Sequence, residues 1–366
     1  MGTHGLKVAI VHDWLNQLGG AEGVLEALKE LYPEAPVYTS IYWPKAMPQE
    51  YEGWDIRTSW LNRLPLIKTH HQPFLPLYPL AFEGFDLRGY DLVISNKSAF
   101  CHGVITPSET VHICYCLTPT RFLWDYHNYV QHERVNPLAG ALLSPILRNL
   151  RLWDKAAADR VEHFVAISES VRQRIHKFYR RDAVVIHPPV DVERFTVHRD
   201  HEDYFLVVSR LIPYKRIDLA IEAFSQLGLP LKVVGDGRDR QRLQAMASPN
   251  VEFLGRLPDY QVEQLLSACR AFVFPGVEDF GIAPLEAQAA GRPVIAYAAG
   301  GALETVVEGV TGLFFREQTA DSLTEAVARF DDGDFDCAAI RRHAQGFDKE
   351  TFKNRLQAFI GGKLGG

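Results

Sequence analysis

The sequence lacks a long apolar segment. A helix that spans a bilayer needs roughly 20 consecutive apolar residues, and no run in this chain of 366 residues approaches that length. The first residues also lack the pattern of a signal peptide. We therefore expect a cytoplasmic protein.

A basic excess is also missing. The formal net charge is −6 and the pI is near 6.2, whereas nucleic-acid binding domains carry clustered positive charge. Gly19 and Gly20, which follow the first predicted strand, do not form the G-x-G-x-x-G fingerprint of a dinucleotide site. We expect neither a nucleic-acid partner nor a cofactor.

Cysteines are few. Five, an odd number, suit a reducing compartment better than a disulfide framework. Cys114 and Cys116 have the spacing of one strand face, but no second Cys or His pair stands at a zinc-site distance, so we interpret them as core residues. Asp334 and Asp336 lie in an acidic link with a glycine and are interpreted as a solvated loop. No metal is expected.

What is present is an alternation of short apolar runs with helical segments, which indicates an α/β fold. A chain of this length is expected to form two domains. Pro188 and Pro189 interrupt the alternation, and they predict a first domain at 1–187, a linker at 188–197 and a second domain at 198–346. We predict strands at residues 7–11, 37–41, 91–95, 111–115, 161–167, 183–186, 204–208, 231–234, 251–253, 271–274 and 293–296.

The stretch from Glu278 to Glu286 follows the predicted strand 271–274. Pro284 is placed to be the first residue of a helix that stops at Gly291, with Glu286 in its first turn. In an open parallel sheet, ligands bind beyond the carboxyl ends of the strands, next to helix N-termini. The alternative is an ordinary strand-loop-helix corner with solvated acids.

Amides at this turn can bind a phosphorylated ligand. Those of Phe280, Gly281 and Ile282 lie where a helix N-terminus presents unpaired N–H groups. The carboxylates of Glu278 and Glu286 can accept hydrogen bonds from sugar hydroxyls.

Other strand ends carry basic residues and glycines. Arg210 and Lys215 follow the strand at 204–208 and can converge on one anion, although a surface salt-bridge network is the alternative. Gly237 follows the next strand, and 255–257 the one after. Glycines admit close backbone approach to a ligand. Together these strand ends predict a pocket for a nucleoside-diphosphate sugar.

Residues 60–82 interleave aromatics and prolines with Arg63, Lys68, His70 and His71. Such a segment can contact an anionic membrane face or a lipid-phosphate acceptor. The alternative, which we favour, is a packed irregular excursion. A peripheral contact with the inner membrane face is therefore only a secondary expectation.

The combination of motifs resembles the retaining glycosyltransferases of family 4. The motifs are the two glutamates of 278–286, the Ser-Arg-Leu and Lys loop of 209–215, Gly-Asp-Gly at 235–237, Gly-Gly at 300–301 and the paired prolines. The resemblance covers nearly the whole chain. It implies the GT-B fold, with two Rossmann-like doubly wound domains facing across a cleft. It also implies a last segment at 347–366 whose helix crosses back to the first domain.

The resemblance also implies roles for individual residues. Arg210, Lys215 and Glu278 form the catalytic set, with the two cations on the diphosphate and Glu278 on the donor sugar. The implied donor-binding residues are Gly19, Gly20, Gly237, Arg256, Leu257, Phe280, Gly281, Ile282 and Glu286. Among them, Glu286 is expected at the ribose and Gly19 and Gly20 at the diphosphate. The implied reaction is retaining and needs no metal.

The sequence departs from the family at Leu117, where similar members carry a histidine ahead of a Thr-Pro pair. His12, Asp13, His112 and Arg121 are therefore the acceptor-side candidates. The runs at 12–14 and 118–125 resemble a mannosyltransferase-like branch, which makes GDP-mannose the first expected donor.

A saccharide or a lipid-phosphate-linked saccharide is the expected acceptor, in glycan or glycolipid assembly. Two alternatives stay open: a GT-B sugar epimerase or phosphorylase, and a non-catalytic protein that binds a nucleotide sugar.

Overall fold

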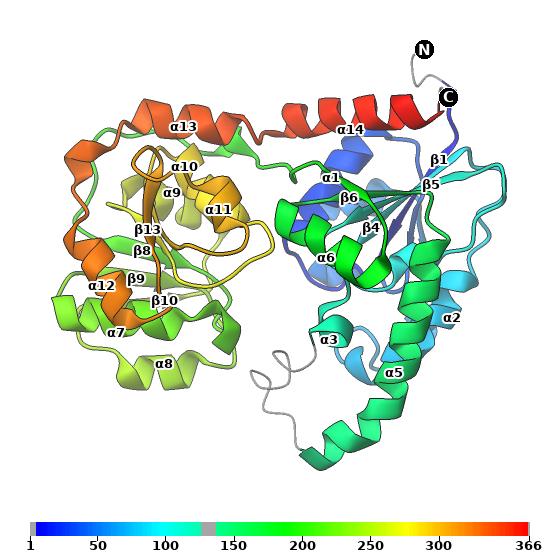
Figure 1. Cartoon of the computed structure of the whole chain (residues 1–366), viewed down its shortest axis with the longest axis horizontal. Coiled ribbons are helices and arrows are strands. Elements are labelled where there is room, and N and C mark those ends of the chain that lie inside the picture. Colours follow the sequence, from blue (N-terminus) through cyan, green and yellow to red (C-terminus); the bar gives the residue numbers. More distant parts are fainter. Residues whose placement is uncertain (1–4, 126–136, 365–366) are drawn as a thin grey trace. The chain divides into compact units, whose positions relative to one another are not determined.

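The computed structural model describes residues 5–125 and 137–364, which form two α/β units (Figure 1). Unit 1 contains Met1–Pro189 and Phe352–Gly366, and unit 2 contains Val190–Thr351. The chain passes between them once inside the predicted linker and once inside the predicted last segment.

Unit 1 is built on a seven-stranded parallel sheet with the order β3-β2-β1-β4-β5-β6-β7. The strands are β1 (Val8–His12), β2 (Val37–Thr39), β3 (Ile56–Thr58), β4 (Leu92–Lys97), β5 (Val111–Cys116), β6 (His163–Ala166) and β7 (Ala183–Val185). The order reverses between β1 and β4, so the topological switch point of this sheet lies at their carboxyl ends. We did not predict β3, which is short and lacks a buried residue.

The α-helices of unit 1 are α1 (Gly20–Leu31), α2 (Tyr78–Glu83), α3 (Arg121–Trp124), α5 (Pro137–Asp159), α6 (Glu169–Tyr179) and α14 (Lys349–Leu364). Short 3-10 helices lie at Pro44–Ala46, Gln49–Gly53, Trp60–Arg63, Gln72–Leu77 and Cys101–Gly103. Ser168 begins α6 as an N-cap, because its hydroxyl accepts a hydrogen bond from the N–H of Val171 at 3.2 Å.

The aromatic segment at 60–82 packs against the sheet. Leu61, Ile67 and Phe82 are fully buried in a cluster with Val93 of β4. The predicted packed excursion is confirmed for these residues, while Leu66 is 73% exposed. Cys114 and Cys116 are buried free thiols, as predicted.

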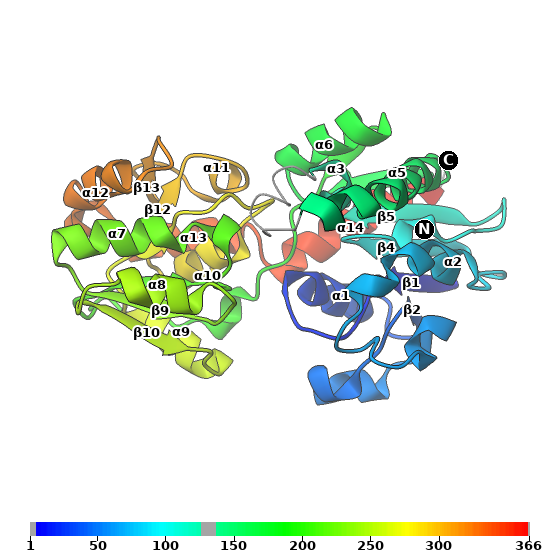
Figure 2. The ribbon, with the colours of Figure 1, turned by 90° about the horizontal axis from the view of Figure 1, so that it is seen from below.

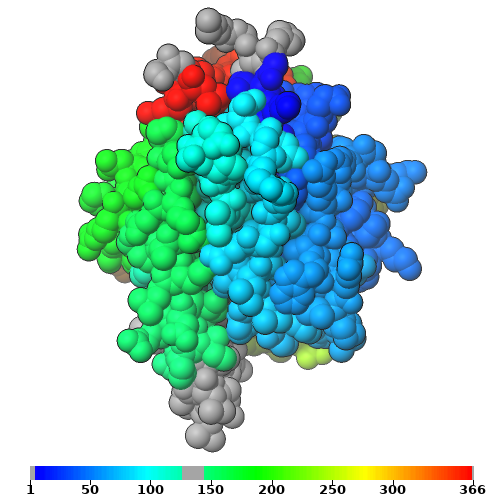
Figure 3. All heavy atoms as spheres, turned by 90° about the vertical axis from the view of Figure 1, so that its right-hand side faces the viewer, coloured from blue at the N-terminus to red at the C-terminus, as the bar shows by residue number. Residues whose placement is uncertain are grey.

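The C-terminal helix α14 packs on unit 1. Phe352, Leu356 and Ile360 are buried on its inner face, and the Phe352 ring lies 5.5 Å from that of Tyr115 on β5. Lys353 forms an ion pair with Glu30 of α1 at 3.0 Å. In the space-filling view the red C-terminal segment accordingly lies beside blue N-terminal residues (Figure 3).

Unit 2 has a six-stranded parallel sheet with the order β10-β9-β8-β11-β12-β13. The strands are β8 (Phe205–Val208), β9 (Leu231–Val234), β10 (Val251–Gly255), β11 (Phe272–Phe274), β12 (Val294–Tyr297) and β13 (Gly312–Phe315). We did not predict β13, which is short and begins with glycine. The α/β class with two doubly wound sheets is confirmed.

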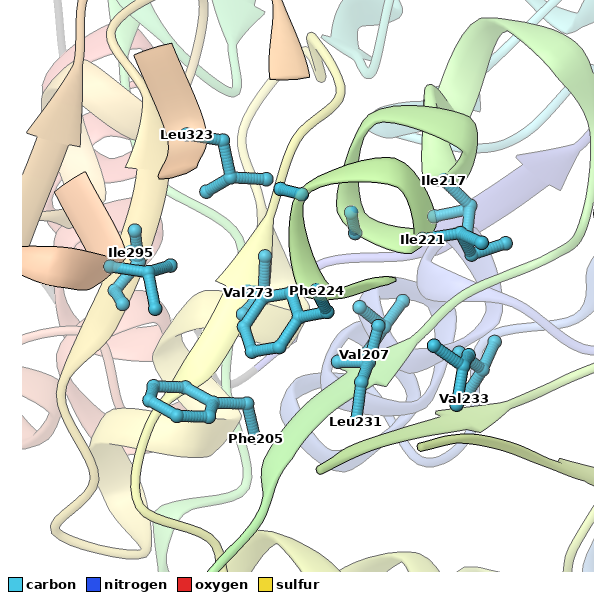
Figure 4. Close-up of a cluster of buried hydrophobic side chains, with 14 of the residues drawn as sticks. Phe205, Val207, Ile217, Ile221, Phe224, Leu231, Val233, Val273, Ile295 and Leu323 are labelled. Atoms are coloured by element: carbon cyan, nitrogen blue, oxygen red, sulfur yellow. The ribbon is translucent and has the colours of Figure 1, made fainter. Parts of the chain in front are cut away.

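Helices cover both faces of this second sheet (Figure 2). They are α7 (Ile217–Leu227), α8 (Arg240–Met246), α9 (Asp259–Ala268), α10 (Ile282–Ala289), α11 (Ala302–Thr305), α12 (Ala320–Ala328) and α13 (Cys337–Gln345), with 3-10 helices at Val192–Arg194, Pro213–Lys215 and Asp332–Asp334. One face forms the core drawn in Figure 4, where Val207 and Val273 of the sheet meet Phe224 of α7 and Leu323 of α12.

Candidate functional site

The loops after β8, β9 and β10 form one bonded surface at the carboxyl edge of the second sheet. The N–H of Leu211 donates to the carbonyl oxygen of Asp236 at 3.0 Å, and that of Gly235 to Gly255 at 2.8 Å. Gly235 has a φ of +127°, and a Cβ on it would overlap the Ser209 carbonyl. Only glycine permits this close approach.

An ion pair between Lys215 and Glu278 lies at this edge. The Lys215 ammonium donates to Oε1 of Glu278, and the two side chains are only 17% and 18% exposed. They lie 63 residues apart in the sequence and line a small pocket with Ser209 and Gly276. Tertiary folding therefore brings one predicted cation and one predicted acid together at this edge of the sheet.

Arg210 shares the loop after β8 with Lys215. Its side chain is exposed, and its guanidinium donates to the Tyr214 hydroxyl at 3.1 Å. Arg256 is exposed directly after β10, and Leu257 beside it is partly buried. Gly237 lies in the loop after β9, so these predicted donor-side residues share one edge of the sheet.

The turn after β11 differs from our prediction. Helix α10 begins at Ile282, so Pro284 is its third residue and Glu286 lies in its second turn, not its first. The reason is Gly281, which is the N-cap with a φ of 102° and lets the chain enter the helix early. The first turn of α10 has no side-chain cap, which leaves amide donors at Ile282 and Ala283.

A glycine pair fixes the same turn. The N–H of Gly301 donates to the carbonyl oxygen of Glu278 at 2.9 Å. A Cβ on Gly301 would overlap the carbonyl of Phe280, and one on Gly300 would lie 2.9 Å from the Val277 side chain. Gly300 and Gly301 are therefore needed to seat the turn that carries Glu278.

Glu286 belongs to a different charge group from Glu278. Its carboxyl is partly buried on α10, and burial raises its pKa, while the positive charge of Arg194 lowers it. Arg194 itself pairs with Glu263 of α9 at 2.7 Å. Sequence reasoning missed Arg194 because it lies in the predicted linker.

Unit 1 presents a glycine turn at the carboxyl end of its sheet. Gly19 and Gly20 are exposed, and Gly19 is the N-cap of α1 without a side-chain hydrogen bond to the helix. Leu117 follows β5 and is partly buried, with its N–H bonded to the Lys97 carbonyl at 2.8 Å. Arg121 is the first residue of α3.

Asp13 is not available as an acceptor contact. It is 1% exposed, and its two oxygens accept from the loop after β4. The donors are the N–H groups of Ser98 (2.7 Å), Ala99 (2.7 Å), Phe100 (2.6 Å) and Cys101 (2.8 Å) and the Ser98 hydroxyl (3.0 Å). We therefore correct its assignment: the carboxylate holds a loop of the protein.

His112 and His12 are corrected in the same way. His112 is fully buried in β5 and lies 2.9 Å from the Ser95 hydroxyl, and burial lowers its pKa to about 3. His12, predicted in a loop, is the last residue of β1 and is 2% exposed. Both imidazoles are bonded in the interior, so neither is placed to contact an acceptor.

The described residues contain neither a metal-binding cluster nor a helix that could span a membrane. Within 5–125 and 137–364, no group of three or more His, Cys, Asp or Glu side chains is placed to hold a metal ion. In the same residues, no helix is long and apolar enough to span a membrane.

Comparison with known proteins identifies the family. Residues 18–194 match the glycosyltransferase family 4 domain, and residues 191–346 match the domain described as glycosyl transferases group 1. The chain belongs to glycosyltransferase family 4. The family resemblance predicted from the sequence is thereby confirmed.

Individual members of the family are similar over different lengths. A segment of 154 residues is 39% identical to a GDP-mannose-dependent monoacylated alpha-(1-6)-phosphatidylinositol monomannoside mannosyltransferase of Corynebacterium glutamicum, covering 38% of this chain and 39% of that protein. An alpha-1,3/1,6-mannosyltransferase of Schizosaccharomyces pombe is 25% identical over 372 residues, which cover 84% of this chain and 70% of that protein. The chain spans 39% to 52% of the length of the first curated relatives that it matches.

A solved structure supports the fold. HepE of Anabaena in complex with UDP has a TM-score of 0.71 and 18% identity, covering 98% of this chain and 100% of that chain. At this identity the likeness shows the fold alone, and the predicted GT-B class is confirmed.

Proposed function

We propose that this family 4 chain transfers a hexose from a nucleoside-diphosphate sugar to a saccharide or a lipid-phosphate-linked acceptor. The observation that carries the proposal is the Lys215–Glu278 ion pair, because it sets a cation and a sugar-binding acid side by side. The uncapped start of α10 next to it supplies amides for a phosphate.

The ion pair suggests how the donor is held. When the diphosphate enters, its oxygens replace Glu278 as the partner of Lys215. The released carboxylate then accepts hydrogen bonds from hydroxyls of the donor hexose. Lys215 and Arg210 stabilise the negative charge that grows on the diphosphate as the glycosyl bond breaks.

We assign the remaining donor contacts from the positions of residues near the carboxyl ends of the strands. Amides at Phe280, Gly281 and Ile282 bind phosphate or sugar oxygens, and Glu286 accepts from the ribose hydroxyls. Gly237, Arg256 and Leu257 contact the base, and Gly19 and Gly20 are the donor-binding residues that we propose in unit 1. Arg121 is the acceptor-side candidate that stays in place.

The first donor to test is GDP-mannose. It is supported by the similarity to the GDP-mannose-dependent mannosyltransferase of Corynebacterium, whereas the solved HepE structure contains UDP. A screen with GDP-mannose, UDP-glucose and other nucleotide sugars, against pooled lipid-phosphate and oligosaccharide acceptors, decides the donor. Transfer from a UDP-sugar but not from GDP-mannose would replace this part of the proposal.

We propose a retaining front-face substitution without a metal, in which the leaving phosphate assists deprotonation of the acceptor. Nuclear magnetic resonance of the first product should show the anomeric configuration of the donor. Transfer should persist in excess EDTA. Trapping of a sugar covalently attached to an enzyme carboxylate would argue against this mechanism.

The same assays separate the alternatives. An epimerase would release free nucleotide or a changed sugar without an acceptor, and a phosphorylase would require inorganic phosphate. A binding protein would show saturable donor affinity with neither transfer nor hydrolysis. A cytoplasmic protein that contacts the inner membrane face should float with acidic vesicles at low salt, and complete recovery in the soluble fraction would contradict that contact.

A further inference from the structure

Three buried polar side chains meet at the switch point of the first sheet. His12 ends β1 and pairs in register with Asn96 of β4, while Glu22 lies in the first turn of α1. Their exposed fractions are 2%, 0% and 5%. Burying polar side chains is costly unless they are hydrogen-bonded, and these three are linked to one another through both ring nitrogens of His12.

The hydrogen bonds define one arrangement of protons. Nδ2 of Asn96 donates to the carbonyl oxygen of Ala21 at 2.7 Å, and this oxygen can only accept. The same Nδ2 lies 3.2 Å from Nδ1 of His12, so Nδ1 is an acceptor. The imidazole proton is therefore on Nε2, which donates to Oε1 of Glu22 at 3.2 Å.

These bonds tie the start of α1 to the sheet. Ala21 is anchored through its carbonyl and Glu22 through its carboxylate, and both follow the Gly19–Gly20 turn directly. Oε2 of Glu22 would lie 3.4 Å from a Cβ on Gly19. Two consecutive glycines have wide conformational freedom, and α1 has no side-chain cap, so the buried bonds restrict the turn instead.

We propose that His12, Asn96 and Glu22 are positioning residues that fix the Gly19–Gly20 turn in its ligand-binding conformation. This inference rests on the proposed function, in which Gly19 and Gly20 are donor-binding residues. None of the three side chains reaches the surface to touch a substrate. Their effect is preorganisation, where a displacement of about 1 Å can cost on the order of 100-fold in rate.

Substitution of Glu22 tests the proposal. Glu22→Ala removes the acceptor for His12, and we expect kcat/KM for the donor to fall about tenfold, mainly through a higher KM. Hydrogen exchange of the amides at 17–24 should become faster. Glu22→Gln should restore most of the loss, because its amide oxygen can still accept from Nε2 of His12.

Glu26 provides a matched control. It lies one turn further along α1, and its carboxylate accepts from the Tyr51 hydroxyl at 3.0 Å. Glu26→Ala removes a comparable bond from the same helix away from the turn, so it should lower the free energy of unfolding without changing the donor KM. Wild-type donor kinetics in Glu22→Ala, or an equal KM increase in both alanine variants, would overturn the proposal.

A second variant covers the case in which Glu22→Ala does not fold. Asn96→Asp has nearly the same shape but places a carboxylate oxygen against the Ala21 carbonyl, so it should raise the donor KM and speed exchange at 17–24. Unchanged exchange and kinetics would again overturn the inference. Failure of the proposed function has a different signature, because the wild-type chain itself would then transfer no sugar.

Discussion

The carboxyl edges of the two sheets use their charges differently. In unit 2, Lys215 and Glu278 form an ion pair in which both side chains are partly exposed, and Arg210 and Arg256 are exposed. In unit 1, Asp13 is buried and bonded to the backbone of a neighbouring loop. The corresponding edge thus keeps charged side chains at least partly exposed in unit 2, whereas in unit 1 a buried carboxylate holds a loop of the protein.

Lys97 and Asp154 are two further charged residues of unit 1 that are buried and bonded to neighbouring segments. Both are fully buried in unit 1. The Lys97 ammonium donates to the Thr118 carbonyl at 3.2 Å, and Asp154 accepts from the Trp124 indole at 2.7 Å. These bonds hold the segment that contains Arg121. The buried charges of unit 1 therefore fix the positions of neighbouring segments. We expect substitution of the partly exposed Lys215 to change mainly activity, and substitution of the buried Asp13 to change mainly stability.

The largest effect is expected at Lys215. Lys215→Ala should lower kcat/KM for transfer by about 10³-fold, because it removes fixed positive charge from the leaving diphosphate. The melting temperature should change little. Lys155→Ala, which removes a partly exposed cation paired with Asp159 of α5, is the control, and steady-state kinetics are the measurement. A loss below threefold would place the diphosphate elsewhere.

Substitution of Asp13 should have the opposite result, with a large effect on stability and a small effect on donor affinity. Asp13→Ala leaves the N–H groups of a buried loop unpaired, so we expect the free energy of unfolding to fall by about 3 kcal/mol. Urea denaturation measures it. Donor affinity per folded molecule should stay near the wild-type value, because Asp13 bonds the loop after β4 and none of the proposed donor-binding residues. Loss of affinity with unchanged stability would contradict the division between the two edges.

Glu286 should gain stability and lose binding when neutralised. Burial raises the pKa of its carboxyl, so the folded state binds a proton more readily than the unfolded state. Its contribution to stability therefore decreases as the pH rises from its ordinary pKa through the raised one. Glu286→Gln should be slightly more stable than the wild type at neutral pH, with no such gain below its ordinary pKa. Donor affinity should fall about tenfold, as calorimetry can show.

The smallest effect at neutral pH is expected at His112. Burial lowers its pKa to about 3 from an ordinary value of 6.5, so the unfolded state takes up a proton that the folded state does not. This group's contribution is complete above pH 6.5 and is lost as the pH falls toward 3. His112→Gln should therefore show a shallower decline of unfolding free energy across that range. An identical acid profile in both proteins would exclude this titration.

Elements with a buried apolar run could be predicted closely. The strand at 231–234 has the predicted bounds, and the strand predicted at 271–274 begins one residue later, at Phe272. By contrast, β3 and β13 were missed, because three or four residues without a clear apolar period give little signal. The start of α10 was misplaced because Pro284 is a local signal, whereas the left-handed Gly281 depends on the surrounding turn.

The sequence allowed candidate site residues to be chosen by their chemical type. It did not show which of their side chains are accessible to a ligand. Strand ends pointed to Lys215 and Glu278, which the structure brings together. The departure from the family at Leu117 led us to Asp13 and His112, which the structure buries. A strand-end position indicates the edge of the sheet that a residue occupies. It does not indicate whether a neighbouring loop has already bonded the side chain.

The sequence by itself determined the α/β class, the family and the edge of each sheet where the candidate residues lie, because apolar period and turn residues are local properties of the chain. Only the tertiary structure decided which charges stay available to a ligand. Lys215 and Glu278 meet across 63 residues, and Asp13 is bonded to a loop more than 80 residues away. Such contacts depend on how strands order in the sheet, and a charge is exposed or buried only after that order exists.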